Sequence, residues 1–87
     1  MKIQIEPHTL RRAEERGTNR DEITDVINHG SDIPAKHGRL ARAMVYPFQQ
    51  NRLGNYYEQK RVEVIYTIER EQVVTITVYV FYGKWEN

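Results

Sequence analysis

The sequence contains no cysteine, which excludes a disulfide framework and a thiolate metal site. It also lacks an apolar run long enough to span a bilayer. The first residues, Met-Lys-Ile-Gln-Ile-Glu, do not have the pattern of a secretory signal peptide. We therefore expect a cytoplasmic protein with no membrane contact. The 87 residues suffice for one small domain, residues 1–87.

An excess of charge of one sign is missing as well. The 13 basic and 12 acidic residues leave a formal charge of +1, which is not the profile of a protein held to nucleic acid by bulk charge. The distribution is uneven, because residues 33–61 contain six basic residues and one acid, Glu58. This clustering indicates either a one-sided basic surface or a chance arrangement along the chain.

The run from Pro7 to Gly17 has the pattern of one helix. Proline suits a first helical position, and glycine suits the position just past the end. Leu10, Ala13 and Gly17 follow the spacing of a buried stripe. The run therefore predicts a helix over residues 7–16 that packs through this stripe.

His8, Arg12 and Arg16 stand four residues apart on another face of this helix. One interpretation is a solvated surface, on which Glu15 pairs with a neighbouring arginine and contributes little. The other is an anion site with a general base, because the dipole near the helix N-terminus disfavours a protonated His8. Nearby acids such as Glu6 act in the opposite direction, so both interpretations stay open.

This spacing resembles the opening motif of the domain-of-unknown-function 4258 family, small bacterial domains that begin His-Ala-x-x-Arg-x-x-x-Arg-Gly-Ile-Ser-x-Glu-Glu-Ile. The matching residues here are His8, Arg12, Arg16-Gly17, Asn19, Asp21-Glu22 and Ile23. Weaker matches follow at Gly38-Arg39 and at Thr77-Val78-Tyr79. The chain departs from the family at Glu6, Thr9 and Thr18, and its Gln49–Tyr57 connection is long.

The resemblance implies a fold and an activity. The family is grouped with the ribonuclease fold of barnase, EndoU, the tRNA-cutting colicins and the RelE-type toxins. It implies a toxin-like ribonuclease that acts on single-stranded or ribosome-associated RNA and is neutralised by an antitoxin protein.

The rest of the chain predicts one more helix and then strands. Asn19 and Glu22 form a capping box for a helix over about Arg20–Asn28, which buries Ile23, Val26 and Ile27. Lys2–Glu6 is a short edge strand or a lead-in to the first helix, Ser31–Gly38 is a loop, and Gln49–Asn55 is a mobile connection. Strands are expected at Arg39–Phe48, with an edge or bulge at Pro47, at Tyr56–Ile68, and at Val73–Tyr82.

The last two strands alternate across a short turn, so we expect an antiparallel hairpin with Val64, Tyr66, Ile76 and Val78 facing the helices. In the strand Tyr56–Ile68, we also expect Val62 and Ile68 to point inward. In the strand Val73–Tyr82, we expect the same of Val74 and Val80. Helices followed by consecutive strands imply an α+β domain. The fold class we predict has two N-terminal helices packed on one face of a twisted antiparallel sheet of three to four strands, and the resemblance makes it RelE/barnase-like.

Several kinds of chemistry have no support in the sequence. The three histidines lack a metal-ligand spacing, and neither a phosphate-binding glycine loop nor a serine or cysteine nucleophile motif is present. We expect no metal and no cofactor. What remains is a histidine, several arginines and a Thr/Tyr strand face, a set that suits metal-free RNA cleavage by the ribose 2′-hydroxyl.

Together with the resemblance, these residues predict a site. The catalytic candidates are His8, Arg12 and Tyr79, and the substrate-binding candidates are Arg16, Arg39, Lys60, Arg61 and Thr77. Interleaved tyrosines would hold single-stranded RNA, namely Tyr46, Tyr56 and Tyr57. We expect Arg39, Lys60 and Arg61 to lie near His8. The alternative is a non-catalytic module that binds RNA or a protein through the same basic face.

Overall fold

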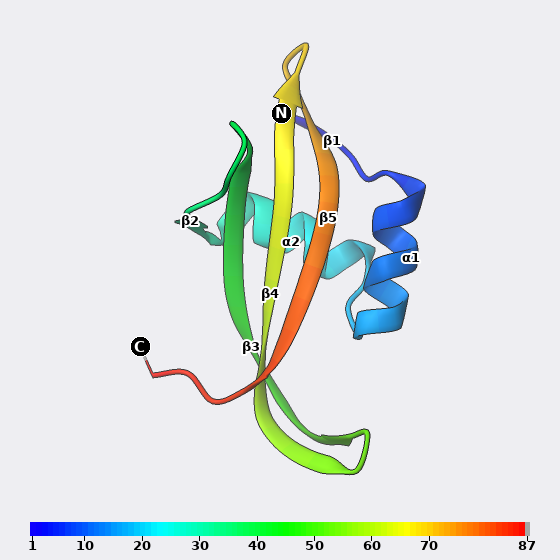
Figure 1. Cartoon of the computed structure of the whole chain (residues 1–87), viewed down its shortest axis with the longest axis vertical. Coiled ribbons are helices and arrows are strands. Elements are labelled where there is room, and N and C mark those ends of the chain that lie inside the picture. Colours follow the sequence, from blue (N-terminus) through cyan, green and yellow to red (C-terminus); the bar gives the residue numbers. More distant parts are fainter. Residues whose placement is uncertain (87) are drawn as a thin grey trace.

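The computed structural model describes residues 1–86, which form two helices and a five-stranded sheet (Figure 1). The helices are α1 (Pro7–Arg16) and α2 (Arg20–His29). The strands are β1 (Lys2–Gln4), β2 (Ser31–Ile33), β3 (Leu40–Arg52), β4 (Asn55–Glu69) and β5 (Gln72–Gly83), in the spatial order β1-β5-β4-β3-β2. The α+β class and the two helices are confirmed.

The predictions of three to four strands and of a purely antiparallel sheet were wrong. β1 joins the sheet edge parallel to β5, with Ile3 opposite Val73, and this makes the sheet mixed. β2 forms the other edge, antiparallel to β3, where the sequence predicted a loop. A three-residue edge strand such as Ser31–Ile33 has no alternation long enough to show in the sequence.

The connection predicted at Gln49–Asn55 was also wrong. β3 and β4 continue as one hairpin to a two-residue turn at Leu53 and Gly54, both with positive φ (51° and 88°). The predicted irregularity at Pro47 is confirmed, because the register between β3 and β4 shifts between Pro47 and Gln50. Proline cannot donate to the ladder, and the shift accommodates it.

The helices cover one face of the sheet, and the other face has no helix over it (Figure 1). α2 packs against β3 and β4 through Ile23, Val26 and Ile27, all buried as predicted. Half of the predicted capping box is present, since the Asn19 side chain accepts a hydrogen bond from the Glu22 N–H at 2.9 Å. The Glu22 carboxylate does not complete the box, because it accepts from Thr18 and Lys60. α1 lies beside β5.

The β4–β5 hairpin is confirmed, with Val64, Tyr66 and Val78 buried toward the helices. The predicted inward orientation of Ile76 was wrong, because a bulge interrupts the alternation of β5. Ile65 pairs with Thr77 and Tyr66 pairs with Thr75, so Ile76 is the extra residue.

Thr75 therefore takes the inward position that the sequence assigned to Ile76. Its hydroxyl donates to Thr9 at 3.0 Å and accepts the N–H of Glu6 at 3.0 Å. Thr9, rather than Leu10, is the fully buried partner of Ala13 on α1. A threonine pair thus fixes the start of α1 to β5.

The burial of Val78 makes it a test of this packing. We expect Val78→Asp to lower the free energy of unfolding by more than about 4 kcal/mol, because the carboxylate would be buried without a partner. Urea denaturation followed by circular dichroism measures this. Phe81→Asp is the matched control, since Phe81 lies on the same strand but is 46% exposed. Equal loss in both variants would show that the inward face was wrongly assigned.

In the part of the chain that the structure describes, neither helix has the length and hydropathy needed to cross a membrane.

Candidate active site

The polar face of α1 lies along the edge of β5. β1 pairs with β5 only at Gln72–Val74, and within residues 1–86 no strand continues that pairing. Side chains of α1 contact this edge instead. His8 Nε2 lies 2.7 Å from the carbonyl oxygen of Ile76, and Arg16 Nη1 donates to that of Val78 at 2.6 Å. The helix therefore satisfies main-chain groups that an edge strand would otherwise offer to another chain.

The contact of His8 determines which ring nitrogen is available for chemistry. A carbonyl oxygen can only accept, so Nε2 is the donor in this hydrogen bond. In the neutral imidazole the lone pair is then on Nδ1. The side chain is exposed, so Nδ1 can accept a proton from a ligand.

Two arginines follow His8 on the same helix, one and two turns further on. Arg12 pairs with Glu15 at 3.3 Å, with side chains 53% and 60% exposed. Such a pair contributes little to stability, so Arg12 can exchange this partner for a phosphate. The Arg16 guanidinium lies 5.1 Å from the ring centroid of Tyr79, within cation–π range.

Tyr79 and Thr77 lie on the other side of the sheet from the helices. They are opposite Glu63 and Ile65 in the β4 register and alternate with the buried Val78. Within the described residues, no hydrogen bond joins Tyr79 to His8, and Arg16 is the residue that contacts both the β5 edge and the Tyr79 ring. The structure thus brings Arg16 and Tyr79 together but does not bring the Tyr79 hydroxyl to the imidazole.

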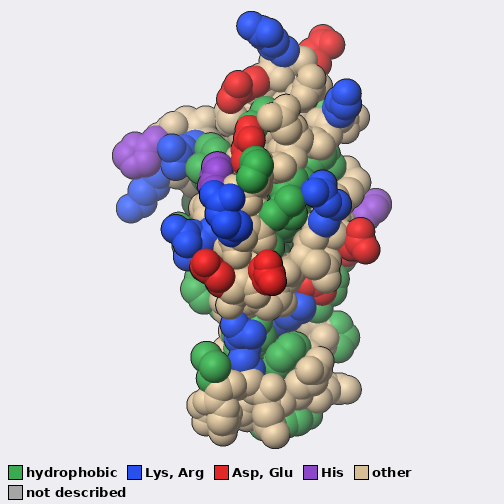
Figure 2. Space-filling model, turned by 90° about the vertical axis from the view of Figure 1, so that its right-hand side faces the viewer, with side chains coloured by type: hydrophobic (Ala, Val, Ile, Leu, Met, Phe, Trp, Pro, Cys, Tyr) green, Lys and Arg blue, Asp and Glu red, His purple; other side chains and the backbone are tan. Residues whose placement is uncertain are grey.

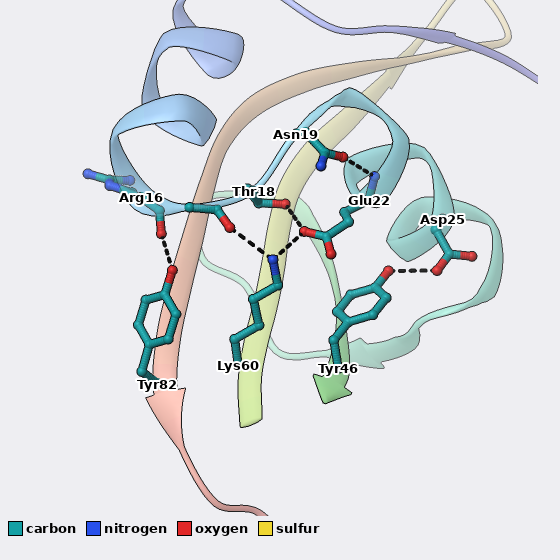
Figure 3. A network of polar contacts seen from close by, with 9 residues as sticks. Arg16, Thr18, Asn19, Glu22, Asp25, Tyr46, Lys60 and Tyr82 are labelled. Carbon is teal, nitrogen blue, oxygen red and sulfur yellow. Dashed lines mark hydrogen bonds and ion pairs between the residues drawn. The ribbon is translucent and has the colours of Figure 1, made fainter. Parts of the chain in front are cut away.

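Lys60 is engaged inside the protein. Its Nζ donates to the Glu22 carboxylate at 2.7 Å and to the Gly17 carbonyl at 2.9 Å, and its side chain is only 12% exposed (Figure 3). Thr18 donates to the same carboxylate at 2.7 Å. A lysine held by two acceptors under a helix end is a structural residue rather than a ligand for substrate.

The other expected basic residues are not near His8. Arg61 donates to Glu63 at 2.9 Å on the uncovered face, opposite Phe81 in the register. Phe81 is five residues from Ile76, about 16 Å along the strand. Arg39 is exposed just before β3, two strands away from β5. On the side of the molecule where α1 lies, basic and acidic side chains are interspersed (Figure 2).

Sequence reasoning missed the side chains that hold the C-terminal end of α1. Its last carbonyl oxygens have no partner within the helix. Tyr82 of β5 donates to the Arg16 carbonyl at 2.6 Å, and Arg52 of β3 donates to that of Glu15 at 3.0 Å (Figure 3 shows the tyrosine). With Lys60, three strands each supply one donor. The sequence indicated only that the last carbonyl oxygens of α1 need hydrogen-bond donors. No local pattern shows which distant residues provide them.

Two of the three tyrosines expected to bind RNA are packed. Tyr46 donates to Asp25 at 2.6 Å (Figure 3), and the Tyr57 ring lies 5.6 Å from that of Tyr82. Tyr56, near the turn of the β3–β4 hairpin, is 60% exposed. Of the three, Tyr56 alone is exposed.

The environment of Tyr46 makes stability depend on alkaline pH. Burial, followed by the hydrogen bond to Asp25, raises the pKa of Tyr46 above its ordinary value of 10.0. The unfolded chain then loses this proton first, so the contribution of Tyr46 to stability is constant below about pH 10 and falls as the pH rises further. Tyr46→Phe should lower the free energy of unfolding by about 1 kcal/mol at pH 7. Above about pH 10, the free energy of unfolding of this variant should fall less steeply than that of the wild type. Thermal denaturation from pH 7 to 11 measures both effects, with Tyr56→Phe as the control. An unchanged slope in Tyr46→Phe would contradict this origin.

Comparison with protein-family models, curated proteins and solved structures finds no match to this chain. The resemblance to the domain-of-unknown-function 4258 family therefore stays a prediction. Any inference about function depends on the residues of α1 that contact the edge of β5.

Proposed function

We propose that this domain is a small metal-independent endoribonuclease of the toxin kind, with the RelE/barnase-like arrangement that the motif resembles. The supporting observation is the hydrogen bond from His8 Nε2 to the Ile76 carbonyl, which leaves Nδ1 as the basic nitrogen. Arg12 lies one helical turn from this imidazole, and Arg16 is bound to the same strand edge. A fixed base beside two guanidiniums is a minimal set for phosphoryl transfer.

In the proposed reaction, His8 Nδ1 removes the proton of a ribose 2′-hydroxyl. The 2′-oxygen attacks the adjacent phosphorus, and the bond from phosphorus to the 5′-oxygen breaks. Arg12 and Arg16 stabilise the negative charge that develops on the phosphate, for which their planar N–H donors are suited. The leaving 5′-oxygen takes a proton from water. The products are a 2′,3′-cyclic phosphate and a 5′-hydroxyl, and DNA is not a substrate because it lacks the attacking group.

The proposed substrate is single-stranded or ribosome-associated RNA in the cytoplasm. An antitoxin would inhibit the enzyme by covering the α1–β5 edge. Tyr79 and Thr77 belong to substrate binding in this mechanism rather than to proton transfer, because the structure places them across the sheet edge from His8.

The test is cleavage of single-stranded RNA in excess EDTA. We expect cleavage that is unchanged by added Mg²⁺ and that ends in a 2′,3′-cyclic phosphate. Activity that appears only when a divalent cation is added would rule out this mechanism.

A non-catalytic RNA- or protein-binding module is the second candidate. It is favoured by the contacts of His8 and Arg16 with β5, because covering a strand edge is by itself a sufficient role for both side chains. Binding of RNA by the folded protein without any cleavage would favour this candidate.

A further inference from the structure

Two aromatic rings lie side by side on the face of the sheet that no helix covers. Tyr79 and Phe81 are 42% and 46% exposed, with ring centroids 6.4 Å apart and planes inclined by 28°. They alternate with Val78 and Val80, which pack on the helix side. The core of the domain is therefore complete without them.

The aromatic pair lies between two guanidiniums. Arg16 reaches over the β5 edge to the Tyr79 ring at 5.1 Å. On the other side, Arg61 of β4 is opposite Phe81 in the register. Within residues 1–86, Arg61 Nε donates to Glu63, and neither of its Nη atoms makes a hydrogen bond.

Arg61 also lines a hollow of about 590 Å³ on β3 and β4. Its other walls include Ile33, Ala43, Val45, Pro47 and Gln59. This volume lies within the range of small-molecule sites. Polar side chains, from His29, Ser31, Gln59 and Arg61, line it together with the apolar ones. Phe81, Arg61 and the hollow thus form a continuous path across the uncovered face.

We propose that this path binds single-stranded RNA, with successive bases stacked on Tyr79 and Phe81, phosphates at Arg16 and Arg61, and a further base in the hollow. Alternate residues of a strand are about 7 Å apart, so each ring can take its own base. Aromatic rings on an open sheet face are a general means of holding unpaired bases, and every base has a face to stack.

This inference deepens the proposed function, because Arg16 connects the aromatic pair to the edge where His8 lies. It predicts tolerance of base sequence and exclusion of duplexes, in which the base faces are already stacked. It also adds Phe81, to which the sequence assigned no role, as a binding residue.

The test measures binding separately from cleavage. The probe is a fluorescent 2′-O-methyl oligonucleotide, which has no 2′-hydroxyl and stays intact, and its affinity is measured by anisotropy in EDTA. Phe81→Ala should weaken binding by about 5- to 150-fold, the range found for loss of one stacked base. Phe81→Trp should bind with about wild-type affinity, because it keeps an aromatic ring at this position. Leu40→Ala is the matched control, because it removes an apolar side chain of similar exposure, 44%, that lies outside the path, and it should leave affinity unchanged.

A second pair of variants tests the phosphate contact. Arg61→Gln should weaken binding and reduce the slope of log affinity against log salt by about 1, whereas Glu63→Gln should leave binding equal or tighter. Equal weakening in both would mean that the ion pair matters for structure and not for RNA.

The outcomes separate the two proposals. Binding that depends on Phe81, in a protein that does not cleave, supports the path and refutes the ribonuclease. Cleaving protein whose affinity is unchanged by Phe81→Ala refutes the path alone. Self-association that Phe81→Ala abolishes, with no RNA binding, would show that the rings form a protein interface and would overturn the proposal.

Discussion

Replacing His8 with glutamine should reduce the rate of RNA cleavage by about 10²–10⁴, the usual contribution of a general base. The glutamine amide nitrogen can donate to the Ile76 carbonyl as Nε2 does, so the contact with β5 is kept. The variant lacks a nitrogen that can take a proton near neutral pH. Only the chemistry should therefore be lost.

The measurement is the single-turnover rate together with RNA affinity and the free energy of unfolding. Affinity and stability should stay within about twofold and 0.5 kcal/mol of wild type, as for a surface substitution. Arg11→Gln, an exposed change on the same helix, is the matched control for the rate. Wild-type activity in His8→Gln would leave His8 with a structural role only.

Replacing Lys60 with methionine should lower the free energy of unfolding by about 2–3 kcal/mol, the cost of losing a charge-assisted hydrogen bond from a part-buried carboxylate. The Glu22 carboxylate, 21% exposed, would keep only the Thr18 hydroxyl, and the Gly17 carbonyl would lose its donor. Both effects act on the junction between α1 and α2. The loss should therefore exceed that of any surface charge.

The controls for Lys60 use a second lysine and a double variant. Lys84 pairs with Glu58 at 3.3 Å, with side chains 68% and 53% exposed, so Lys84→Met should cost no more than about 0.5 kcal/mol. Lys60→Met combined with Glu22→Leu should recover much of the loss, since no part-buried charge is left without its partner. Equal destabilisation by Lys60→Met and Lys84→Met would contradict the assignment of Lys60 as a structural residue.

Both helices were predictable because their signals are local. Pro7 and Gly17 mark the limits of α1, and the Gly17 backbone has the positive φ of 94° that favours glycine there. Asn19 and the run of Ile23, Val26 and Ile27 likewise specify α2. These signals depend on residues at most a few positions apart.

Features that depend on pairing between distant strands were not predictable. The bulge at Ile76 arises from the register of β4 against β5, and it places a threonine where alternation predicted an isoleucine. The β3–β4 hairpin passes through Asn51 and Asn55, a residue type with low strand propensity, and its register is completed by a turn at Leu53-Gly54.

The candidate site was predictable in part. The spacing of His8, Arg12 and Arg16 places them on one helix face, and a helix period is sufficient to show this. Their contacts with β5 are tertiary, as is the part-buried pairing of Lys60 with Glu22. Sequence therefore indicated residues that belong together on a helix but could not separate free cations from those held inside the fold.

We propose that this domain cleaves RNA through the ribose 2′-hydroxyl without a metal. The most direct measurement uses a DNA oligonucleotide with one internal ribonucleotide, incubated with the protein in EDTA and examined by mass spectrometry. The proposed mechanism predicts one cut, on the 3′ side of the ribonucleotide, with a 2′,3′-cyclic phosphate and a 5′-hydroxyl as the new ends. Cleavage between deoxynucleotides, or no cleavage of this probe or of any RNA by folded protein that binds RNA, would contradict it.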